Sequence, residues 1–474
     1  MPSSIFNLRV PLPGDQVFLM NTLTDAQLVV SSDVAALLDA PLDRAPLGPE
    51  ARAAADVLID QGFITPGRDH DRRTLANYLD VLTSDTDELN VTLLTTLQCN
   101  FACDYCFQGD HGDYNKFADK MSLDTAQKTA AWIEREMDRQ RPKKVVVTYF
   151  GGEPLLNLPV MYYLAERLWN ATQERDIPIV VSIITNGLLL TEEIVDRMNR
   201  FGLRGVKITL DGDKQAHDRL RPLRGGQGTF DRIVANMRRV AGKTGIAIGG
   251  NFDDSSFASY PALLRFLSEQ EFADKLVKVN FKPVIRNADD AGVMVPSKKS
   301  LKQGLSLTPV STDGTPLKPL GGTCMTSAGA GTASTCDGCS SLDDQMTFLR
   351  EETRRHGFKT PDGVHNGPCH VHMKHAHTIG PDGSLYACPG FTGEKGMSTG
   401  HIDDRRDSWR DVVKDKFDRL SPWTSCGDCA FIPVCAGGCI AASHMTLGDM
   451  NTPACHKTSY EAAVVSLAHT FASA

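Results

Sequence analysis

Residues 98–107 read QCNFACDYCF and place three cysteines, Cys99, Cys103 and Cys106, on one short loop. Three residues and then two separate them, and an apolar run typical of a buried strand, residues 91–97, comes immediately before. Three thiolates on one tight loop can hold three irons of a cubane cluster and leave the fourth iron open to a small ligand. A single zinc ion needs a fourth ligand close by and usually takes a different spacing. The loop therefore favours a cluster site over a zinc site or three unrelated thiols.

Around this loop, from residue 91 to 285, apolar strand-like runs alternate with helical periods. The expected strands are 91–97, 144–150, 178–185, 205–210, 245–252 and 277–284. The expected helices are 122–140, 158–172, 191–201, 229–240 and 260–272. Buried strands that are each followed by a helix predict a parallel sheet covered by helices. Six such units predict an α/β fold with an open, partial (β/α)6 barrel, whose active site lies at the carboxyl ends of the strands.

Glycines and polar residues follow these strands at the expected edge. They are Gly151, Gly152 and Glu153 in YFGGEPLLN, Asn186 in ITNG, and Thr209 and Asp211 in ITLDG. Paired glycines let backbone groups approach a ligand closely, and a carboxylate suits an ammonium group. Because the carboxyl ends of parallel strands share one edge, we expect these residues to lie near the cysteine loop.

The cysteine spacing together with GGEP after the next strand resembles the radical S-adenosylmethionine (radical SAM) enzymes. The resemblance implies a [4Fe–4S] cluster held by Cys99, Cys103 and Cys106, with its open iron bound to the amino and carboxylate groups of SAM. It also implies that reductive cleavage of SAM gives a 5′-deoxyadenosyl radical, which abstracts hydrogen from a substrate.

By the same resemblance, several other residues meet SAM. Gly151, Gly152 and Glu153 would face its amino group. Thr209, Asp211 and Asn186 are candidates for hydrogen bonds to its carboxylate or ribose, and Tyr105 for packing beside its adenine. The segment HDRLRP, residues 217–222, resembles the family's segment after LDG, so either Arg219 or Arg221 contacts SAM or peptide, or the segment is a solvated basic loop.

Seven further cysteines occupy the last quarter of the chain. They are Cys369 and Cys388, with Gly383 between them, then Cys426, Cys429, Cys435 and Cys439, and finally Cys455. The spacings resemble the SPASM domain, whose precedent implies two auxiliary [4Fe–4S] clusters. By that precedent the first takes Cys369, Cys388 and Cys439, and the second takes Cys426, Cys429, Cys435 and Cys455. A zinc ribbon is the alternative for CxxC pairs in general.

The first auxiliary cluster would have only three cysteines, which leaves its fourth position open. His375, in the run CHVHMKHAH, could occupy it, or a substrate group could bind there. Cys324, Cys336 and Cys339 fall outside both patterns. They could lend a ligand, form a further metal site, exchange with a substrate thiol, or be free loop thiols.

The rest of the chain suggests three more units. Residues 1–90 combine strand-like and helical patterns into a small α+β module, either a winged-helix-like element that binds a leader peptide or a structural extension of the barrel. Residues 286–362 form a connector with one helix over SLDDQMTFLREETRRHGF. Residues 363–474 have short segments, glycines and cysteines but little apolar periodicity, so we expect a loop-rich domain stabilised by its Fe–S clusters.

Composition excludes several classes of protein. Thirteen cysteines among 474 residues are too dilute for a disulfide scaffold, which takes about 8–10%. No apolar run approaches the roughly 18 residues of a membrane span, and the N-terminus lacks a signal-peptide pattern. A formal net charge of −8 argues against a nucleic-acid or anionic-membrane partner. We therefore expect a cytoplasmic protein whose clustered cysteines bind metal.

The resemblances imply a peptide maturase that forms a thioether or carbon–carbon crosslink, or oxidises a side chain, on a precursor peptide. A reductant such as flavodoxin or ferredoxin would supply electrons. Pro389 follows Cys388 where the anaerobic sulfatase-maturating branch has a basic aspartate, so that role loses weight. The alternatives are maturation of an enzyme active site or protein-derived cofactor, and a non-catalytic Fe–S or zinc scaffold that binds a peptide. No catalytic acid or base stands out in the sequence.

Overall fold

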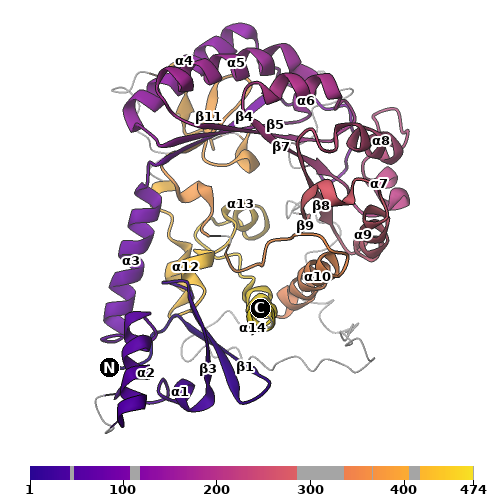
Figure 1. Ribbon diagram of the computed structural model, residues 1–474. Coiled ribbons are helices and arrows are strands. Elements are labelled where there is room, and N and C mark those ends of the chain that lie inside the picture. The colour runs from indigo at the N-terminus through magenta and orange to yellow at the C-terminus, as the bar shows by residue number, and fades with distance from the viewer. Residues whose placement is uncertain are drawn as a thin grey trace.

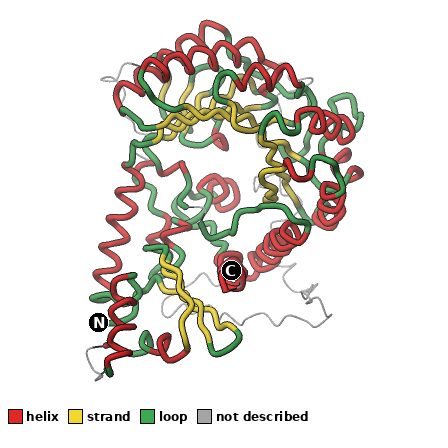
Figure 2. Tube along the Cα trace, in the orientation of Figure 1, coloured by secondary structure: helices red, strands yellow, loops and turns green. Residues whose placement is uncertain are grey.

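The computed structural model describes residues 1–42, 47–106, 118–284, 336–365, 367–394, 396–404 and 417–472, without the side chains of 336–341. Six parallel strands form an arc in sequence order (Figures 1 and 2). They are β4 (Glu88–Thr96), β5 (Lys144–Gly151), β6 (Ile179–Thr185), β7 (Leu203–Thr209), β8 (Gly245–Phe252) and β9 (Leu276–Pro283). The open (β/α)6 arrangement expected from the sequence is confirmed.

Helices cover the outer side of this arc (Figure 1). They are α4 (Leu123–Gln140), α5 (Leu158–Glu174), α6 (Glu192–Asn199), α7 (Lys214–Leu220), α8 (Phe230–Val240) and α9 (Tyr260–Ser268). Alternate residues of each strand face them: in β5, Val145, Val147 and Tyr149 are fully buried. Each such side chain stabilises the fold by about 1.5–3 kcal/mol. The alternation leaves the opposite residues of each strand on the inner face of the arc.

The C-terminal part of the chain extends this sheet beyond β4. Strand β10 (Ala376–Ile379) pairs in parallel with β4, and β11 (Ser384–Tyr386) and β12 (Gly400–His401) continue antiparallel from it. The sheet thus has nine strands in the order β12-β11-β10-β4-β5-β6-β7-β8-β9. Strands of two to four residues carry too little periodicity to be expected from the sequence. Their pairing fixes the C-terminal cysteines relative to β4 and the loop that follows it.

The remaining helices lie on the inner side of the arc and below it (Figure 1). They are α10 (Cys336–Arg355), α12 (Ile432–Cys435), α13 (Ile440–Ala442) and α14 (Lys457–Ala472), with a π-helical turn at Ser443–Leu447. Short 3-10 turns occupy Pro154–Asn157, Phe257–Ser259, Ala273–Lys275, His370–His372, Pro389–Phe391 and Pro422–Cys426. Helix α10 begins earlier than the sequence pattern suggests, and α14 is not anticipated by it. Among the described helices, none is both long and apolar enough to cross a bilayer.

The N-terminal module is an antiparallel sheet with three helices. Its strands are β1 (Asn7–Leu12), β2 (Gln16–Asn21) and β3 (Ala26–Ser31), in that order. Its helices are α1 (Ser32–Ala36), α2 (Pro49–Asp60) and the long α3 (Arg68–Ser84), which leads to β4 (Figure 1). The sequence analysis names neither β3 nor α3, because their polar residues blur the apolar period. Phe6, Leu75 and Leu79 pack against Ile432 and Ala436, so the module is joined to the C-terminal part of the chain.

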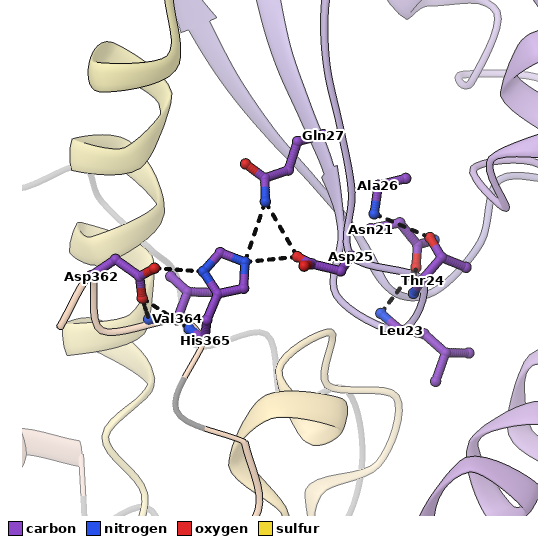
Figure 3. Close-up of polar contacts among 9 residues, drawn as sticks. All are labelled: Asn21, Leu23, Thr24, Asp25, Ala26, Gln27, Asp362, Val364 and His365. Atoms are coloured by element: carbon purple, nitrogen blue, oxygen red, sulfur yellow. Dashed lines mark hydrogen bonds and ion pairs between the residues drawn. The ribbon is translucent and has the colours of Figure 1, made fainter. Parts of the chain in front are cut away.

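A histidine links the module to the segment that follows α10. His365 Nδ1 lies 2.5 Å from Asp362 Oδ2, and its Nε2 lies 2.7 Å from Asp25 Oδ1, beside Gln27 (Figure 3). Burial lowers the pKa of His365, but the hydrogen bonds to Asp362 and Asp25 outweigh it, so the net pKa is raised. Protonated His365 therefore bridges two carboxylates from distant parts of the chain.

We expect His365→Gln to weaken this link in a pH-dependent way. A raised pKa contributes stability that is fully present below the unfolded pKa, about 6.5, and is lost as pH rises through the folded value. The contribution is at most about 1 kcal/mol, because the ring is partly exposed. Thermal denaturation should show a deficit in melting temperature at pH 6 that vanishes by pH 9. His70→Gln, on the exposed face of α3, is the control and should not lower the melting temperature at either pH. If the deficit in melting temperature of His365→Gln grew with pH, the role assigned to His365 would be contradicted.

Candidate active site at the carboxyl edge of the barrel

The cysteine loop leaves β4 and is fastened to the segment after α7. The amide of Ala102 donates to the carbonyl of Pro222 (2.9 Å), and the Arg224 guanidinium donates through Nε to the carbonyl of Cys99 (2.9 Å). Phe101 and Leu223 form an isolated antiparallel bridge. The loop is therefore held at the carboxyl edge of the sheet, where the sequence places it.

The three thiols of this loop lie together. Burial, and then the charges of Glu153, Cys103 and Cys106, together raise the pKa of Cys99 to about 12. Burial likewise raises the pKa of Cys103 to about 11, against the opposing charge of Arg221. Such thiols keep their protons until a positively charged group binds them, as a metal cluster does. The arrangement fits a cluster held by three thiolates.

Glu153 lies fully buried behind the loop. Its Oε1 accepts hydrogen bonds from the Leu155 amide (3.0 Å) and the Thr185 hydroxyl (2.8 Å), and its Oε2 accepts one from the Asn186 amide (2.7 Å). Burial nevertheless raises its pKa. The carboxylate thus joins the ends of β5 and β6 beside Cys99, and its position is fixed by the protein alone.

Gly151 and Gly152 are required by the packing of the protein itself. A Cβ on Gly151, whose φ is +130°, would lie 2.2 Å from the Thr96 carbonyl oxygen. A Cβ on Gly152 would lie 2.3 Å from the carbonyl oxygen of Gln98 and 2.4 Å from that of Leu97. The glycines therefore let the GGEP turn lie directly against the backbone that enters the cysteine loop.

Asn186 and Thr209 end neighbouring strands on the same edge. Asn186 donates through Nδ2 to the side-chain oxygen of Asn100 (2.7 Å) and lies 3.9 Å from the Cys99 sulfur. Thr209 is the last residue of β7 and is partly exposed on the inner face. The structure therefore brings Asn186 to the cysteine loop, and it places Thr209 one strand further along.

Asp211, Tyr105 and Arg221 form a buried polar cluster. The Tyr105 hydroxyl hydrogen-bonds Asp211 Oδ2, and one Arg221 amino group donates to Tyr105 (2.6 Å) and lies 3.4 Å from Asp211. Asp211 also accepts from the Asn251 amide (2.6 Å) and is fully buried. Burial raises the pKa of Tyr105, so its hydroxyl stays protonated as a donor.

Arg221 is the central cation of this site. It lies over the Phe101 ring, 5.6 Å from its centroid, and it lowers the pKa of Cys103. Its buried Nε has no hydrogen-bond partner among the described residues, which leaves a donor available for an anionic ligand. Arg219, the other candidate, donates instead to the Ser255 carbonyl at the surface. The sequence does not distinguish the two arginines, because only the turn at the end of α7 buries one of them.

His217 supports Arg221 from behind. Its Nδ1 accepts from the Asp211 amide (3.1 Å), and its Nε2 lies 3.1 Å from the Thr229 hydroxyl, which donates to the Arg221 carbonyl (2.9 Å). Burial, and then the charge of Arg221, lower its pKa well below the usual value, so the ring is neutral. This histidine positions the arginine and is not named as a site residue by the sequence.

We expect Arg221→Met to destabilise the protein and to weaken SAM binding. Removing the cation leaves Asp211 buried without its partner, which costs about 3–5 kcal/mol. The double variant Arg221→Met/Asp211→Asn should regain melting temperature, because no charge remains unpaired, yet should not regain SAM affinity in equilibrium dialysis. Arg219→Met is the matched control and should match the wild type. Unchanged SAM affinity in Arg221→Met would contradict the role of Arg221.

Comparison with known proteins agrees with this geometry. The model of the radical SAM superfamily matches residues 93–251, which span β4 to β8 and include the cysteine loop and the GGEP turn. Residues 93–251 belong to the radical SAM superfamily.

Individual relatives of this chain are distant. It is 27% identical to the radical SAM cyclopropyl synthase TigE of Paramaledivibacter caminithermalis over 137 residues, and 28% identical to GTP 3′,8-cyclase of Clostridium perfringens over 155. These matches cover 27% and 33% of this chain, and only 28% and 43% of the relatives. The solved structure of native anSMEcpe with bound AdoMet and Cp18Cys peptide has the same fold, with a TM-score of 0.56 at 16% identity. That likeness covers 81% of this chain and 99% of the other.

The seven C-terminal cysteines of the chain gather into two groups. Burial raises the pKa of Cys388 to about 12, and the neighbouring thiols that add to it are Cys369 and Cys439. Burial also raises the pKa of Cys426 to about 12, with contributions from Cys429, Cys435 and Cys455. The two groups have the same members as the SPASM precedent. Among the described residues, no three His, Cys, Asp or Glu side chains are arranged around a single metal ion.

The second group is covered by the N-terminal module. Cys426 and Cys429 pack against the contact between Phe6, Leu75 and Ile432. Arg72 of α3 forms a two-point ion pair with Asp428, between these cysteines, with distances of 3.0 and 3.2 Å. The module therefore has a structural role at this cysteine group whatever else it binds.

Ligation of the first group by His375 stays a prediction, and the buried Nδ1 of this residue has no hydrogen-bond partner among the described residues. That ring lies beside Asp85 and Glu88 at the start of β4, and its backbone carbonyl accepts from the Asn90 amide (3.1 Å). Cys324 lies outside the described residues. Cys336 and Cys339 begin α10, and their side chains also lie outside what the structure describes.

Proposed function

We propose that this chain is a radical SAM maturase that modifies a precursor peptide through a 5′-deoxyadenosyl radical. The observation that carries the proposal is the meeting of three thiols, a buried carboxylate and a buried arginine with an unpartnered donor at one barrel edge. The modification we propose is a thioether or carbon–carbon crosslink, or a side-chain oxidation.

In this proposal Cys99, Cys103 and Cys106 hold the [4Fe–4S] cluster, and Glu153 with the adjoining glycines faces the amino group of SAM. Arg221 offers its free Nε to the SAM carboxylate. When bound, the cluster and SAM supply one-electron reduction and a carbon radical that abstracts hydrogen. The chain's own residues bind and orient SAM, and the Asp211, Tyr105 and His217 contacts fix Arg221 in place.

We also propose that some residues at this edge contact SAM directly. The candidates are Asp211, Tyr105, Thr209 and Asn186. Both oxygens of Asp211 already accept hydrogen bonds from the protein, and Tyr105 is tied to it. Thr209 is better placed for direct contact with SAM, because it is partly exposed at the end of β7. Asn186 is buried, and its side chain is bonded to Asn100 and to the Leu188 amide.

The two C-terminal cysteine groups would hold the auxiliary [4Fe–4S] clusters, with a flavodoxin or ferredoxin as the reductant. Helix α12, which contains Cys435, and helix α13, which follows Cys439, lie on the inner side of the arc (Figure 1). The peptide substrate is supported by the anSMEcpe structure, which holds a bound Cp18Cys peptide in the same fold.

The N-terminal module would bind the leader part of the precursor. Strand β3 lies at the edge of the three-stranded sheet, and no other described strand pairs with its free side. An edge strand presents backbone donors and acceptors that an extended peptide can pair with.

The test is anaerobic incubation of reconstituted protein with SAM and dithionite, followed by quantification of 5′-deoxyadenosine. Formation of the nucleoside supports the proposal, and its absence from a fully iron-loaded protein overturns it. Co-expression with each short peptide encoded nearby, followed by mass spectrometry, identifies the substrate. A loss of two mass units per event indicates crosslinking or oxidation.

A further inference from the structure

Three lysines lie together on the inner face of the barrel, on β7 and β9. Val206 and Ile208 of β7, and Val279 and Phe281 of β9, are buried under the helices. Lys207 and Lys278 alternate with these residues and therefore face the opposite side of the sheet. The register confirms it, since Lys207 pairs with Ala247 and Ala247 pairs with Lys278.

Lys282 completes the cluster. It lies four residues after Lys278 on the same face, and both are exposed, whereas Lys207 is half-buried. Burial, and then the positive charges of Lys282 and Lys278, together lower the pKa of Lys207 to about 8. Among the described residues, no acidic group opposes this shift of the Lys207 pKa. Like charges without a counterion are costly, and such clusters mark sites for an anionic ligand.

Small residues of β8 form the floor between the lysines. Ala247 and Gly249 face the same side, and the Lys207 stem runs over Gly249, where a Cβ would lie 2.5 Å from its Cε. The stem therefore points across β8 toward β9. Among the described residues, none of the three lysines forms an ion pair or a side-chain hydrogen bond, so their ammonium groups are available to a ligand.

The cluster lies between the two proposed reaction centres. Lys207 precedes Thr209 by two residues, about 7 Å along the strand, and Thr209 ends at the edge that carries Asp211 and Arg221. On the other side, the charge of Lys282 reaches Cys369 of the first C-terminal group. A molecule held by the lysines would be next to both.

We propose that Lys207, Lys278 and Lys282 bind carboxylate side chains of the substrate, so that this enzyme acts on an acidic segment of its precursor peptide. The inference rests on the proposed function and specifies its substrate class. Lys278 and Lys282 are about 13 Å apart along β9, and Lys207 is about 10 Å across from Lys278. These spacings suit Asp or Glu residues two to four positions apart in an extended peptide.

The test measures binding of fluorescein-labelled peptides to SAM-loaded protein by fluorescence anisotropy. The acidic probe is (Gly-Glu)4, the neutral one (Gly-Gln)4, and the basic one (Gly-Lys)4. We expect the wild type to prefer the acidic probe at least tenfold and to lose affinity as salt rises. The variant Lys278→Glu/Lys282→Glu should lose that preference and bind the basic probe instead, and Lys278→Gln/Lys282→Gln should fall between.

Lys275→Glu/Lys359→Glu is the matched control, because it reverses two exposed lysines beside the same strand but outside the cluster. It should bind as the wild type does. Equal binding of acidic and neutral probes by the wild type overturns the inference, as does displacement of the acidic probe by an oligodeoxynucleotide at lower concentration than by unlabelled (Gly-Glu)4.

Production of 5′-deoxyadenosine without peptide separates this inference from the proposed function. It should be unchanged in Lys278→Glu/Lys282→Glu, since these lysines are not SAM ligands here. A loss would assign the lysines to SAM and overturn the inference. If the wild type itself makes no 5′-deoxyadenosine, the proposed function fails while the peptide-binding result stands by itself.

The variant Lys207→Met distinguishes a lysine that binds the peptide from one that only stabilises the strand. Removing a half-buried ammonium that faces two like charges should raise the melting temperature near pH 7, while binding of (Gly-Glu)4 falls several-fold. A lower melting temperature would show that Lys207 stabilises the strand, and it would contradict the role assigned here.

Discussion

Replacing Cys99, Cys103 and Cys106 together by alanine should abolish 5′-deoxyadenosine formation and lower the iron content by about four per chain. The reason is that these thiols share one loop and lie beside Glu153 and Arg221, so no other cysteine group can take over their cluster. The remaining seven C-terminal cysteines should still hold about eight irons. Iron and sulfide assays of anaerobically reconstituted protein, with chromatography of the nucleoside product, measure both effects.

The matched control removes the same number of cysteines elsewhere, as Cys324→Ala/Cys336→Ala/Cys339→Ala. We expect it to keep the iron content and the SAM-cleaving activity of the wild type. Loss of SAM cleavage in this control but not in the loop variant would contradict the site.

Gly152→Ala should have the second largest effect, although it adds only one methyl group. The new Cβ would lie within 2.6 Å of the Leu97 and Gln98 carbonyl groups, which are backbone and immediately precede Cys99. Neither can give way as a flexible side chain would, so the loop itself must shift. A shift of about 1 Å at a site of this kind costs about 100-fold in rate. We therefore expect SAM cleavage at least 100-fold slower and a deficit of the first cluster's iron.

Gly48→Ala is the control for Gly152→Ala. Gly48 precedes α2, has ordinary backbone angles and has no atom within 4 Å of its Cβ position. It should keep full iron content and rate. Iron bound by the C-terminal groups of Gly152→Ala shows that the variant folds, and a wild-type rate in that folded variant would refute the assigned role of the glycine pair.

The barrel could be predicted from sequence because its strands are uniformly apolar. Buried runs such as residues 144–150 and 245–252 have a clear length and boundary, and each is followed by a helical period. The cysteine loop and GGEP were placed correctly for the same reason, since each follows such a strand. Strand β3, helix α3 and the β10–β12 extension were not predicted from the sequence, because they are short, polar or stabilised only by tertiary contacts.

The sequence names candidate site residues but not the contacts among them. Sequence named Asp211, Tyr105 and one of two arginines separately, whereas the structure joins them around Arg221. Nothing in the spacing shows that α7 buries Arg221 and exposes Arg219. The lysine cluster was not predicted either. Lys278 and Lys282 follow Lys207 by 71 and 75 positions, and the three residues come together only through the register of β7, β8 and β9.

Iron and acid-labile sulfide per chain, measured with zinc after anaerobic reconstitution, test the central claim most directly. The account predicts about twelve irons and twelve sulfides, for one cluster on the β4 loop and two on the C-terminal groups, with only trace zinc. About four irons would leave the C-terminal groups without clusters. Stoichiometric zinc without iron would contradict the radical SAM account as a whole.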